Sequence, residues 1–349
     1  MVPDKSDLFG LFADEIAAKI KPLGLEKYRG QQIAEWMYLR GVNTFADMTN
    51  IPKAKRLLLD SNFIIGSVSV IAEQHSADGL TSKFLLSFAD DLAVETVLMR
   101  QPYGNSVCVS SQVGCAMGCT FCASTLSGVA RNLSGGEILS QVLYVNHLLA
   151  QQQEKVDSIV IMGAGEPLAN YDNVLRFIRL LHEKYCLNLS YRSITLSTAG
   201  LTPEIDRLGN EGLPITLSIS LHAPNNKLRS QLMPINNRYP IESLLAAADR
   251  YVNRTGRRIT YEYILIKGVN DRPGHARDLA RILKGKLANV NLIPVNPVPE
   301  RGLLRPYASE ITCFEQILQE KYINVSIRKE MGKEIDAACG QLRRKVLGD

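Results

Sequence analysis

Three cysteines, Cys115, Cys119 and Cys122, stand close together in one short segment of this chain. Three residues separate the first pair and two separate the second, so the segment supplies three thiolates where a cubane iron–sulfur cluster normally takes four. One iron of such a cluster would have no protein ligand. Because an open metal position can bind and activate a substrate or cofactor, the spacing predicts a reactive [4Fe–4S] cluster.

A structural zinc site is the main alternative use of these cysteines. Such sites take four ligands, usually as two short-spaced pairs far apart in sequence. The chain has no second C-x2-C or H-x3-H pair, although Cys108 could supply a fourth thiolate. A disulfide framework is a weaker alternative. The chain has 7 cysteines in 349 residues and no apolar signal segment, which predicts a reduced, cytoplasmic protein.

The composition fits a chain with a large core and a polyanionic partner. It is 46% hydrophobic, and no apolar run approaches the ~18 residues of a membrane span, so we expect no membrane association. The formal net charge of +5 is compatible with nucleic acid, although each basic cluster could equally be solvated surface. The clusters are Lys53, Lys55 and Arg56; Arg254, Arg257 and Arg258; and Arg343, Arg344 and Lys345.

The elements that position the cysteines fall into four predicted regions. Residues 1–60 carry apolar residues at helical spacing and predict a small helical domain. Residues 61–100 predict a small antiparallel β extension, with strands over 62–73, 82–89 and 92–100. Residues 101–300 predict the main α/β domain, and 301–349 form a C-terminal segment that carries Cys339.

Strands and helices alternate through the main domain, which predicts parallel strands with crossover helices, in an open sheet or a partial barrel. The candidate strands cover 105–112, 157–163, 192–199, 215–222, 259–266 and 289–296. The candidate helices cover 134–152, 171–184, 203–209, 240–253 and 272–284.

Unusual residues follow the C-terminal ends of these strands, where the chemistry of βα folds gathers. The cysteine segment follows the first strand, and Gly165 and Glu166 follow the second. The later strands end at Ser197, at Ser220, Leu221 and His222, and at Asn296. Each of these residues alone fits a cap, a plain turn or a structural histidine. Their common position predicts that they lie on one rim.

Four cysteines lie outside the cluster segment. Cys108 stands on the first strand of the main domain, and Cys339 stands in a small-residue stretch near the C-terminus. That stretch favours close backbone approach over core packing. Cys186 and Cys313 lack glycine-rich surroundings, so we expect both to be buried small hydrophobes.

The cysteine spacing directly after a predicted strand resembles the signature of the radical S-adenosylmethionine (SAM) enzymes. Longer stretches resemble the bacterial RNA adenine-C2 methyltransferases of that superfamily, which modify 23S rRNA and certain tRNAs. The resemblance runs from about residue 25 to 345. It is carried by the stretches 108–115, 165–168, 220–225, 233–236 and 336–342.

The resemblance implies a partial (βα)6 radical SAM barrel and assigns roles to residues. Cys115, Cys119 and Cys122 would bind the cluster, Cys339 would carry the methyl group, and Cys108 would be the second redox cysteine. Glu95, from its pattern only an exposed strand glutamate, matches the proposed acid–base residue of the family. The expected SAM contacts are Gly165, Glu166, Ser197, Ser220, Leu221, His222 and Asn296.

The implied chemistry needs two cysteines and two SAM molecules per turnover. Adenine C2 is electron-poor, so a thiolate at Cys339 would first accept the methyl group. A SAM-derived radical would then activate that group for addition to the ring. Cys108 would release the product by attacking the Cys339 sulfur, leaving a disulfide for an external thiol to reduce. Either Cys108 or Glu95 would remove the C2 proton.

The resemblance also implies partners. The substrates would be 23S rRNA at the peptidyl-transferase centre and tRNA at adenine 37, with the target base leaving its stack. A reduced flavodoxin-type protein would supply electrons, and we expect a monomer. The N-terminal region, with Arg29, Lys53 and Lys55, is a candidate RNA platform.

Two other functions are alternatives to C2 methylation. The first is C8 methylation of adenine by the antibiotic-resistance relatives, which tend to replace the equivalent of Pro167 and alter the segment around 292–297; here both look like the C2 type. Ala164 departs from the bulkier residue of many relatives. The second is a noncatalytic RNA-binding protein with a structural cluster, which would need neither Cys108 nor Cys339.

Overall fold

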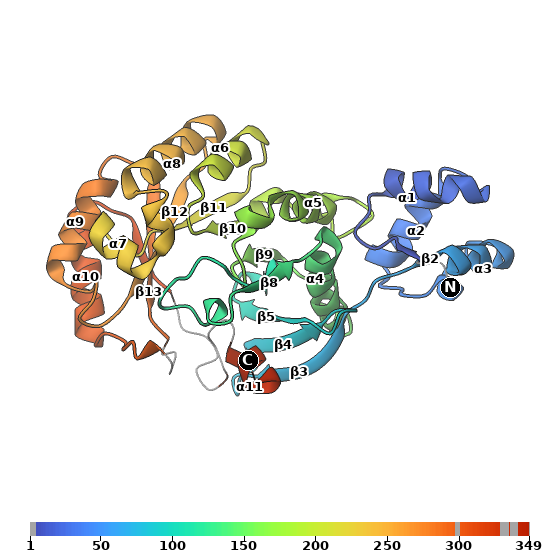
Figure 1. Ribbon diagram of the computed structural model, residues 1–349, viewed down its shortest axis with the longest axis horizontal. Helices are drawn as coiled ribbons and strands as arrows, with labels where there is room; N and C mark the ends of the chain where they lie inside the picture. Colours follow the sequence, from blue (N-terminus) through green and yellow to red (C-terminus); the bar gives the residue numbers. More distant parts are fainter. Residues whose placement is uncertain (1–4, 297–300, 329–334, 336–340, 349) are drawn as a thin grey trace.

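A single ten-stranded mixed sheet organises the molecule. The computed structural model describes residues 5–296, 301–328, 335 and 341–348 (Figure 1). The strand order is β14-β13-β12-β11-β10-β9-β6-β5-β4-β3. From β6 to β14 neighbouring strands are parallel, and from β3 to β6 they are antiparallel. The sequence-predicted alternation of strand and helix therefore gives the expected α/β architecture.

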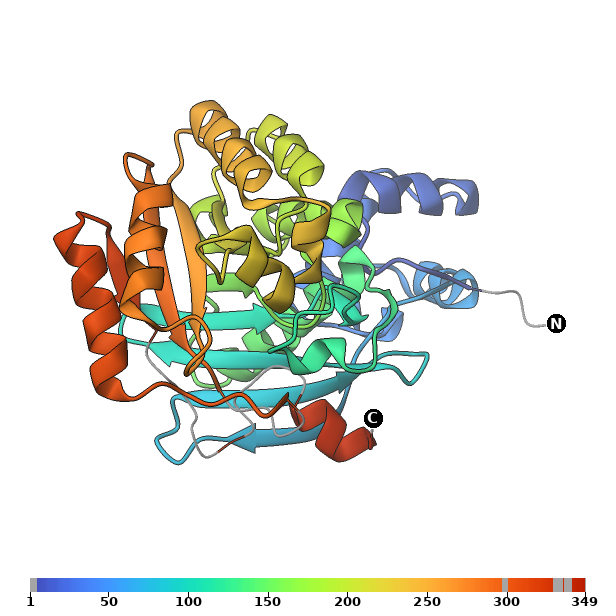
Figure 2. The ribbon, with the colours of Figure 1, turned by 60° about the vertical axis from the view of Figure 1, so that its left-hand side comes forward.

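The parallel part contains the six expected strands and a short seventh. The strands are β6 (Gly104–Val109), β9 (Ser158–Ile161), β10 (Ile194–Thr198), β11 (Thr216–Ser220), β12 (Ile259–Leu265), β13 (Ala288–Pro294) and β14 (Val325–Ile327). The helices on the outside of the curve are α4 (Gly135–Ala150), α5 (Tyr171–His182), α6 (Thr202–Asn210), α8 (Ile241–Thr255), α9 (Pro273–Leu283) and α10 (Ala308–Glu320) (Figure 2). A further helix, α7 (Asn226–Leu232), follows β11 and contacts the ends of β10 and β11 through Arg229. Sequence analysis missed α7, α10 and β14.

The predicted β extension is present but is not a separate sheet. Its strands are β3 (Ser69–His75), β4 (Thr81–Ser87) and β5 (Ala93–Gln101). β5 pairs with β6, with Val97 opposite Cys108, so the extension continues the central sheet. The first strand also begins later than predicted, because Phe63–Ile64 form β2, which pairs with β1 (Ser6–Asp7) instead. The domain boundaries drawn from the sequence remain predictions.

Alternating residues give the parallel strands one apolar and one polar face. Leu196, Leu217 and Tyr261 are at most 1% exposed, and they belong to the main hydrophobic core. The other face carries two cross-strand rows of polar residues. These rows are Ser197–Ser218–Thr260–Asn289 and Ser220–Glu262–Asn291–Ser326. Since residues opposite one another share a face, the interior of the curved sheet is lined with hydrogen-bonding groups.

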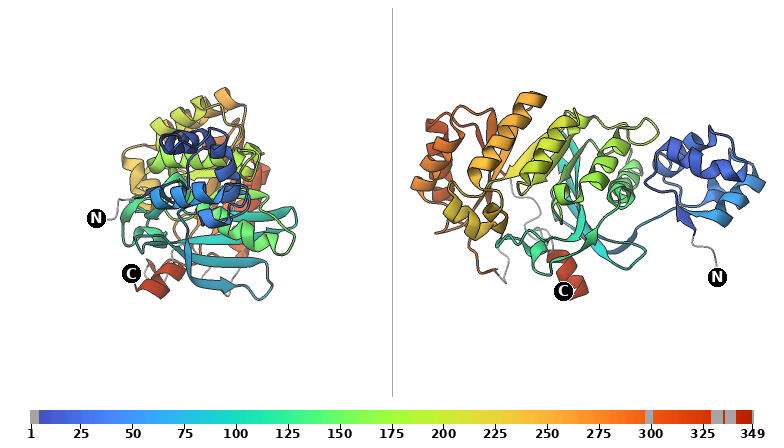
Figure 3. Two further views of the ribbon diagram at one scale, coloured as in Figure 1. Left: turned by 90° about the vertical axis from the view of Figure 1, so that its right-hand side faces the viewer. Right: turned by 45° about the horizontal axis from the view of Figure 1, so that its top comes forward.

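The N-terminal helices form a lobe beside α4 and α5 (Figure 3). They are α1 (Ala13–Ile20), α2 (Arg29–Tyr38) and α3 (Lys53–Asn62). Gly10, at φ +87°, lies so close to α4 that a Cβ would meet Gly136 at 2.7 Å. Arg176 of α5 donates to both carboxylate oxygens of Glu15, at 2.6 and 2.8 Å. Close backbone contact and a bidentate ion pair thus fix the lobe to the barrel.

A short hairpin and the C-terminal helix complete the fold. β7 (Gln112–Gly114) and β8 (Val129–Asn132) pair antiparallel and form the stem of the loop that carries the three cysteines. The C-terminal helix α11 (Gln341–Leu347) packs on β5 through Leu342, which is 2% exposed and contacts Leu85 and Ala93. In the ranges that the structure describes, no helix combines the length and apolarity needed to cross a bilayer.

Candidate active site

The three clustered cysteines sit on one loop with a closed stem. The backbone N–H of Cys115 donates to the carbonyl of Gly128 at 2.8 Å, where the loop returns to β8. Farther out, the N–H of Thr120 donates to the carbonyl of Leu232 at 3.0 Å, which ties the loop to α7. Cys115 and Cys119 are buried and Cys122 is half-buried. The stem and α7 therefore hold all three thiols on the predicted rim.

The three thiols are close enough to influence one another. Burial raises the pKa of Cys115 to about 11 and raises the pKa of Cys119 further, and the charges of neighbouring loop cysteines add to both shifts. Burial also raises the pKa of Cys122. Without a cation the thiols are therefore protonated, whereas bound iron would stabilise their thiolates.

Three thiols on one short loop match the donor set of a cubane with one open iron. A tetrahedral zinc site with Zn–S bonds near 2.3 Å places its sulfurs about 3.8 Å apart. Among the described residues, no three His, Cys, Asp or Glu side chains converge tightly enough to hold one metal ion. A cubane gives each thiolate its own iron, so it accepts three thiols that are near neighbours without converging on one point.

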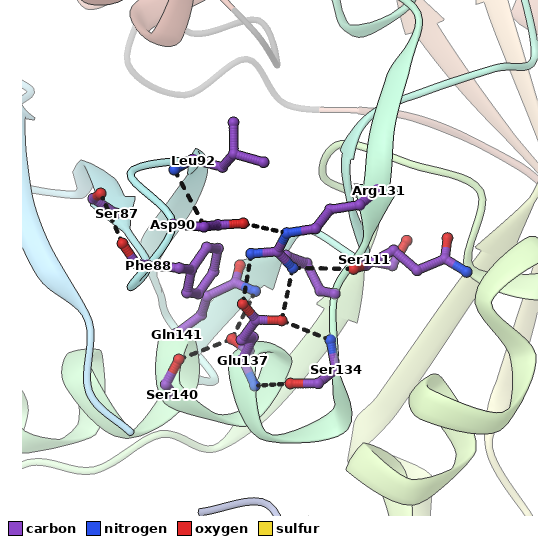
Figure 4. Close-up of polar contacts among 12 residues, drawn as sticks. Ser87, Phe88, Asp90, Leu92, Ser111, Arg131, Ser134, Glu137, Ser140 and Gln141 are labelled. Atoms are coloured by element: carbon purple, nitrogen blue, oxygen red, sulfur yellow. Dashed lines mark hydrogen bonds and ion pairs between the residues drawn. The ribbon is translucent and has the colours of Figure 1, made fainter. Parts of the chain in front are cut away.

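A half-buried arginine connects the stem of the cysteine loop to the rest of the sheet. Arg131 of β8 donates to Asp90, in the turn between β4 and β5, at 2.6 Å (Figure 4). It also donates to both carboxylate oxygens of Glu137 in α4, at 2.9 and 2.7 Å. Glu137 in turn forms the capping box of α4 with Ser134. One guanidinium thus joins the stem, the β4–β5 turn and the start of α4.

Gln112 couples that stem to the loop after β9. Its side chain is 5% exposed and uses both ends of the amide. Nε2 donates to Oδ1 of Asn132 at 2.7 Å, and Oε1 accepts from the backbone N–H of Glu166 at 2.8 Å. Gly165, at φ +104°, packs so closely that a Cβ would meet the Gln112 side chain at 2.6 Å. Only glycine fits there, so the loop and the stem keep a fixed separation.

Glu166 is buried and its carboxylate bonds to backbone groups. Oε1 accepts from the N–H of Leu168 at 3.0 Å and Oε2 from the N–H of Ala199 at 2.6 Å. Burial raises the pKa of Glu166 to about 7, against these hydrogen bonds and one from Thr198, which lower it. The side chain therefore joins the loops after β9 and β10. Each carboxylate oxygen has a second lone pair that could accept from a ligand.

His222 lies beside the cysteine loop. Its ring packs edge-on against Phe121, between Cys119 and Cys122 in sequence, with the ring centroids 4.9 Å apart. Nδ1 accepts from the N–H of Ile264 at 3.0 Å, so the proton of the neutral ring is on Nε2. Burial and the nearby Arg229 lower the pKa of His222 to about 3. The imidazole is therefore neutral at physiological pH.

Arg229 is the main rim residue that sequence analysis missed. It is fully buried in α7, and burial lowers its pKa to about 10. Its guanidinium donates to the carbonyls of Ala199 at 2.7 Å, Ser220 at 3.1 Å, Leu221 at 3.2 Å and Tyr239 at 3.3 Å, and to Oδ1 of Asn236 at 3.1 Å. It thereby fixes the ends of β10 and β11. Nothing in its local sequence separates it from a surface arginine.

The remaining predicted SAM contacts lie at neighbouring strand ends. Ser197 is the second-to-last residue of β10, and Ser220 is the last residue of β11. Both side chains are half-buried on the polar face of the sheet. Leu221 is fully buried, and Asn296 lies half-buried just after β13. The structure therefore brings the predicted set to one rim, while the role of each residue stays a prediction.

Glu95 and Cys108 line a cavity with residues of the cysteine loop. The lining includes Ser124 and Gly163 from loops of the barrel and Arg343 and Arg344 from α11. We call it the Glu95 cavity. The expectation of an exposed Glu95 is wrong, because its side chain is 6% exposed and pairs at 3.1 Å with Lys83, which is 1% exposed. Pairing with Lys83 is what permits a carboxylate to be buried there.

Cys108 faces charged groups in this cavity. Burial raises its pKa, and the positive charges of Arg328 and Lys83 act in the opposite direction. Cys339 lies outside the described residues, as does any disulfide that it forms. The described helix α11 begins shortly after it, and the backbone N–H of Arg343 donates to Oε1 of Glu95 at 2.9 Å. The described part of the C-terminal segment is therefore anchored at the cavity.

Two other predictions can be compared with the structure. Cys186 is 1% exposed, as expected, but Cys313 is exposed on α10, an element that sequence analysis did not predict. In the N-terminal lobe, Lys55 pairs with Glu26 at 2.7 Å, and the Arg29 side chain is only 11% exposed and donates to Gln32 and Asn50. Of the three basic residues singled out there, Lys53 is the exposed one.

Comparison with known proteins identifies two matching family models. Residues 6–65 match the N-terminal domain of ribosomal RNA large subunit methyltransferases, and residues 109–280 match the radical SAM superfamily. The two matches account for the N-terminal lobe and most of the parallel barrel.

Similar proteins cover nearly the whole chain. Probable dual-specificity RNA methyltransferases RlmN from Symbiobacterium thermophilum and Desulforamulus reducens are each 50% identical over 98% of this chain, and the matches cover 92% and 97% of those proteins. The crystal structure of a radical SAM methyltransferase from Sphaerobacter thermophilus superimposes with a TM-score of 0.93 at 44% identity, covering 96% of this chain and 98% of that one.

Proposed function

Because this chain belongs to the RlmN family of dual-specificity RNA methyltransferases, within the radical SAM superfamily, we propose that it methylates C2 of adenine in RNA. The substrates are 23S rRNA at the peptidyl-transferase centre and tRNA at adenine 37. The observation that supports the proposal is a cavity that Cys108 shares with the loop of the three cysteines. Cys108 and Glu95 line a cavity that also includes Ser124 of the cysteine loop.

The family implies a [4Fe–4S] cluster and SAM. Cys115, Cys119 and Cys122 hold the cluster, which leaves one iron for SAM. When both are bound, they supply a deoxyadenosyl radical by one-electron cleavage of SAM. Gly165, Glu166 and His222 bind SAM together with Ser197, Ser220, Leu221 and Asn296, which supply backbone groups and small polar side chains around the polar barrel interior.

Cys339 is the methyl carrier in this proposal. Its thiolate would attack the methyl carbon of one SAM and release S-adenosylhomocysteine. The radical from a second SAM would take a hydrogen atom from the S-methyl group, so each turnover takes two SAM molecules. The resulting carbon radical would add to C2 of adenine while still bonded to the Cys339 sulfur, and the adduct would lose one electron to the oxidised cluster and the C2 proton to a base. Attack by the Cys108 thiolate on the Cys339 sulfur would then form an S–S bond and break the S–C bond, and the released carbon would take up a proton to give the methylated base. A thiol reductant restores both cysteines.

The C2 proton needs a base near the bonded adenine. Glu95 and Cys108 are the two candidates, and both line the cavity. Glu95 pairs with Lys83 at 3.1 Å, and the positive charge of Arg328 lowers the pKa of Cys108, against the effect of burial. We therefore keep both residues as candidate bases for this step.

Partners follow from the same proposal. A flavodoxin-type protein supplies the electron, and the enzyme acts as a monomer. The N-terminal lobe is the RNA platform, with Lys53 on its surface, and its firm attachment through Gly10 and Arg176 keeps bound RNA at a fixed distance from the rim. A cytoplasmic location fits these partners.

Nucleoside mass spectrometry tests the reaction. The parent protein, with reconstituted cluster, SAM and reductant, is incubated anaerobically with 23S rRNA and tRNA from a strain lacking the resident enzyme. We expect 2-methyladenosine in both RNAs. Formation of 8-methyladenosine would replace the C2 assignment by the C8 one. SAM cleavage without RNA methylation would overturn the proposed substrate.

A further inference from the structure

The cysteine loop is held from outside by an arginine that stands far away in sequence. Nη2 of Arg301 donates to Oγ1 of Thr125 at 3.0 Å and to the carbonyl of Cys122 at 3.4 Å. The separations along the chain are 176 and 179 residues. Arg301 therefore reaches the backbone of a predicted cluster ligand from the segment that follows the barrel strands.

Thr125 links Arg301 to the backbone of two of the cysteines through its hydroxyl group. Its hydroxyl lies 3.1 Å from the carbonyl of Cys119 and 2.9 Å from that of Cys122. A hydroxyl has one proton to donate and lone pairs to accept with. Arg301, a donor only, takes the acceptor side and leaves the hydroxyl proton for the carbonyls. The guanidinium thus orients Thr125 toward the loop.

The segment that carries Arg301 is itself fixed. Leu303 packs on the small hydrophobic cluster that includes Cys119, Met233 and Ile266. The backbone N–H of Lys267 donates to the carbonyl of Leu304 at 2.9 Å. Arg301 is therefore held at the loop by the chain on its C-terminal side.

The charge of Arg301 lies at the backbone of the cysteine loop. In the ion pairs of the described residues, no carboxylate pairs with Arg301, and its Nε is buried without a hydrogen-bond partner in those residues. A buried donor and a cation that has no carboxylate partner among the described residues, at the backbone of Cys122, match the anionic surface of a bound cluster.

We propose that Arg301 is a positioning residue for the iron–sulfur cluster, which closes the cysteine loop and raises the reduction potential of the bound cluster. Reduction adds one negative charge to the cluster, and a nearby fixed positive charge stabilises the more negative state. Hydrogen bonds and net charge near the sulfurs are known determinants of such potentials. The inference rests on the proposed cluster but does not depend on the RNA reaction.

Redox titration of the full-length protein with reconstituted cluster distinguishes the effect of the Arg301 charge from the effect of its planar guanidinium. Arg301→Met keeps the aliphatic stem and removes the charge, Arg301→Lys keeps the charge and loses the planar fork, and Arg281→Met removes an exposed charge on α9. For Arg301→Met we expect a more negative midpoint and faster iron loss to a chelator. A tenfold fall in the reduced-to-oxidised ratio at fixed potential corresponds to 59 mV for this one-electron couple.

The two remaining variants set the limits of the effect. Arg301→Lys should keep most of the midpoint but lose iron faster, because one ammonium cannot reproduce the fork. Arg281→Met should match the parent in both. An Arg301→Met midpoint equal to that of Arg281→Met would overturn the proposal. Failure of the parent protein to assemble a cluster would instead contradict the proposed roles of Cys115, Cys119 and Cys122.

Discussion

Arg229 at the barrel rim donates to four backbone carbonyls and one side-chain amide, whereas Lys83 in the Glu95 cavity pairs with a carboxylate. Glu166 and His222 follow the Arg229 pattern, since both accept from backbone N–H groups. The buried polar side chains of the rim therefore hold the loops at the strand ends in fixed positions. The cavity keeps charged and nucleophilic side chains against one another, which suits it to proton and sulfur chemistry.

The largest effects should come from the two cysteines proposed for sulfur chemistry. Cys339→Ala should abolish methylation while RNA still binds, because no methyl acceptor remains. Cys108→Ala should instead accumulate a covalent protein–RNA adduct that cannot be released. Denaturing gels with labelled RNA distinguish the two variants. Unchanged methylation by Cys339→Ala would support the noncatalytic alternative or another carrier.

Arg229→Met should unfold the rim. It removes five hydrogen bonds and leaves buried carbonyls without donors, so we expect a loss on the order of 5 kcal/mol in the free energy of unfolding. Arg250→Met is the matched control, because its exposed pair with Asp206 should contribute less than about 1 kcal/mol. Urea denaturation compares them, and equal losses would contradict the scaffold role of Arg229.

Lys83→Met should destabilise the cavity by leaving Glu95 buried without its cation. Breaking a buried ion pair typically costs about 3–5 kcal/mol, and we expect the lower end here because Arg343 still donates to Glu95. The double variant Lys83→Met/Glu95→Gln should recover much of this loss. A double-mutant cycle by urea unfolding measures the coupling. Additive losses would show that the pair is not the source of the effect.

His222 should make the rim sensitive to acid. Its pKa in the folded state is about 3, below the ordinary 6.5, so the unfolded chain binds the proton more readily. Its contribution is fully present above about pH 6.5 and is lost progressively as the pH falls toward 3. At pH 5 the loss should be about 2 kcal/mol. His222→Gln should remove this dependence, which urea unfolding across pH 4.5–7.5 would detect.

Gln112→Met should have the smallest effect of these changes. It loses the bond accepted from the N–H of Glu166 and the bond donated to Asn132, at a cost of about 1–2 kcal/mol. The stem of the cysteine loop should loosen, and the cluster should lose iron to a chelator faster than in the parent. Gln112→Glu should be worse, because it places a carboxylate at a buried position opposite the Asn132 side-chain oxygen. Equal iron loss in the three proteins would place the coupling elsewhere.

Local sequence was enough to predict the regular part of the fold. The spacing of apolar residues located β10, β11, β12 and most barrel helices within a few residues. This is possible because the buried face of a strand or helix repeats with a fixed period along the chain. α10 and β14 were missed at the end of the barrel. The gap between the predicted strands 82–89 and 92–100 placed Asp90 in a turn, but the sequence did not predict its ion pair with Arg131 of β8. The partner lies 41 residues farther along the chain.

The sequence alone located the three closely spaced cysteines and the residues at the strand ends, because spacing and order can be read along the chain. It also determined membership of the family, through stretches spread over the whole chain. Only the tertiary structure decided that Glu95 is buried with Lys83, that Arg229 fixes the ends of β10 and β11, and that Arg301 reaches the cysteine loop. Each of these contacts depends on which strands and loops become neighbours, and a side chain's own surroundings in sequence do not carry that information.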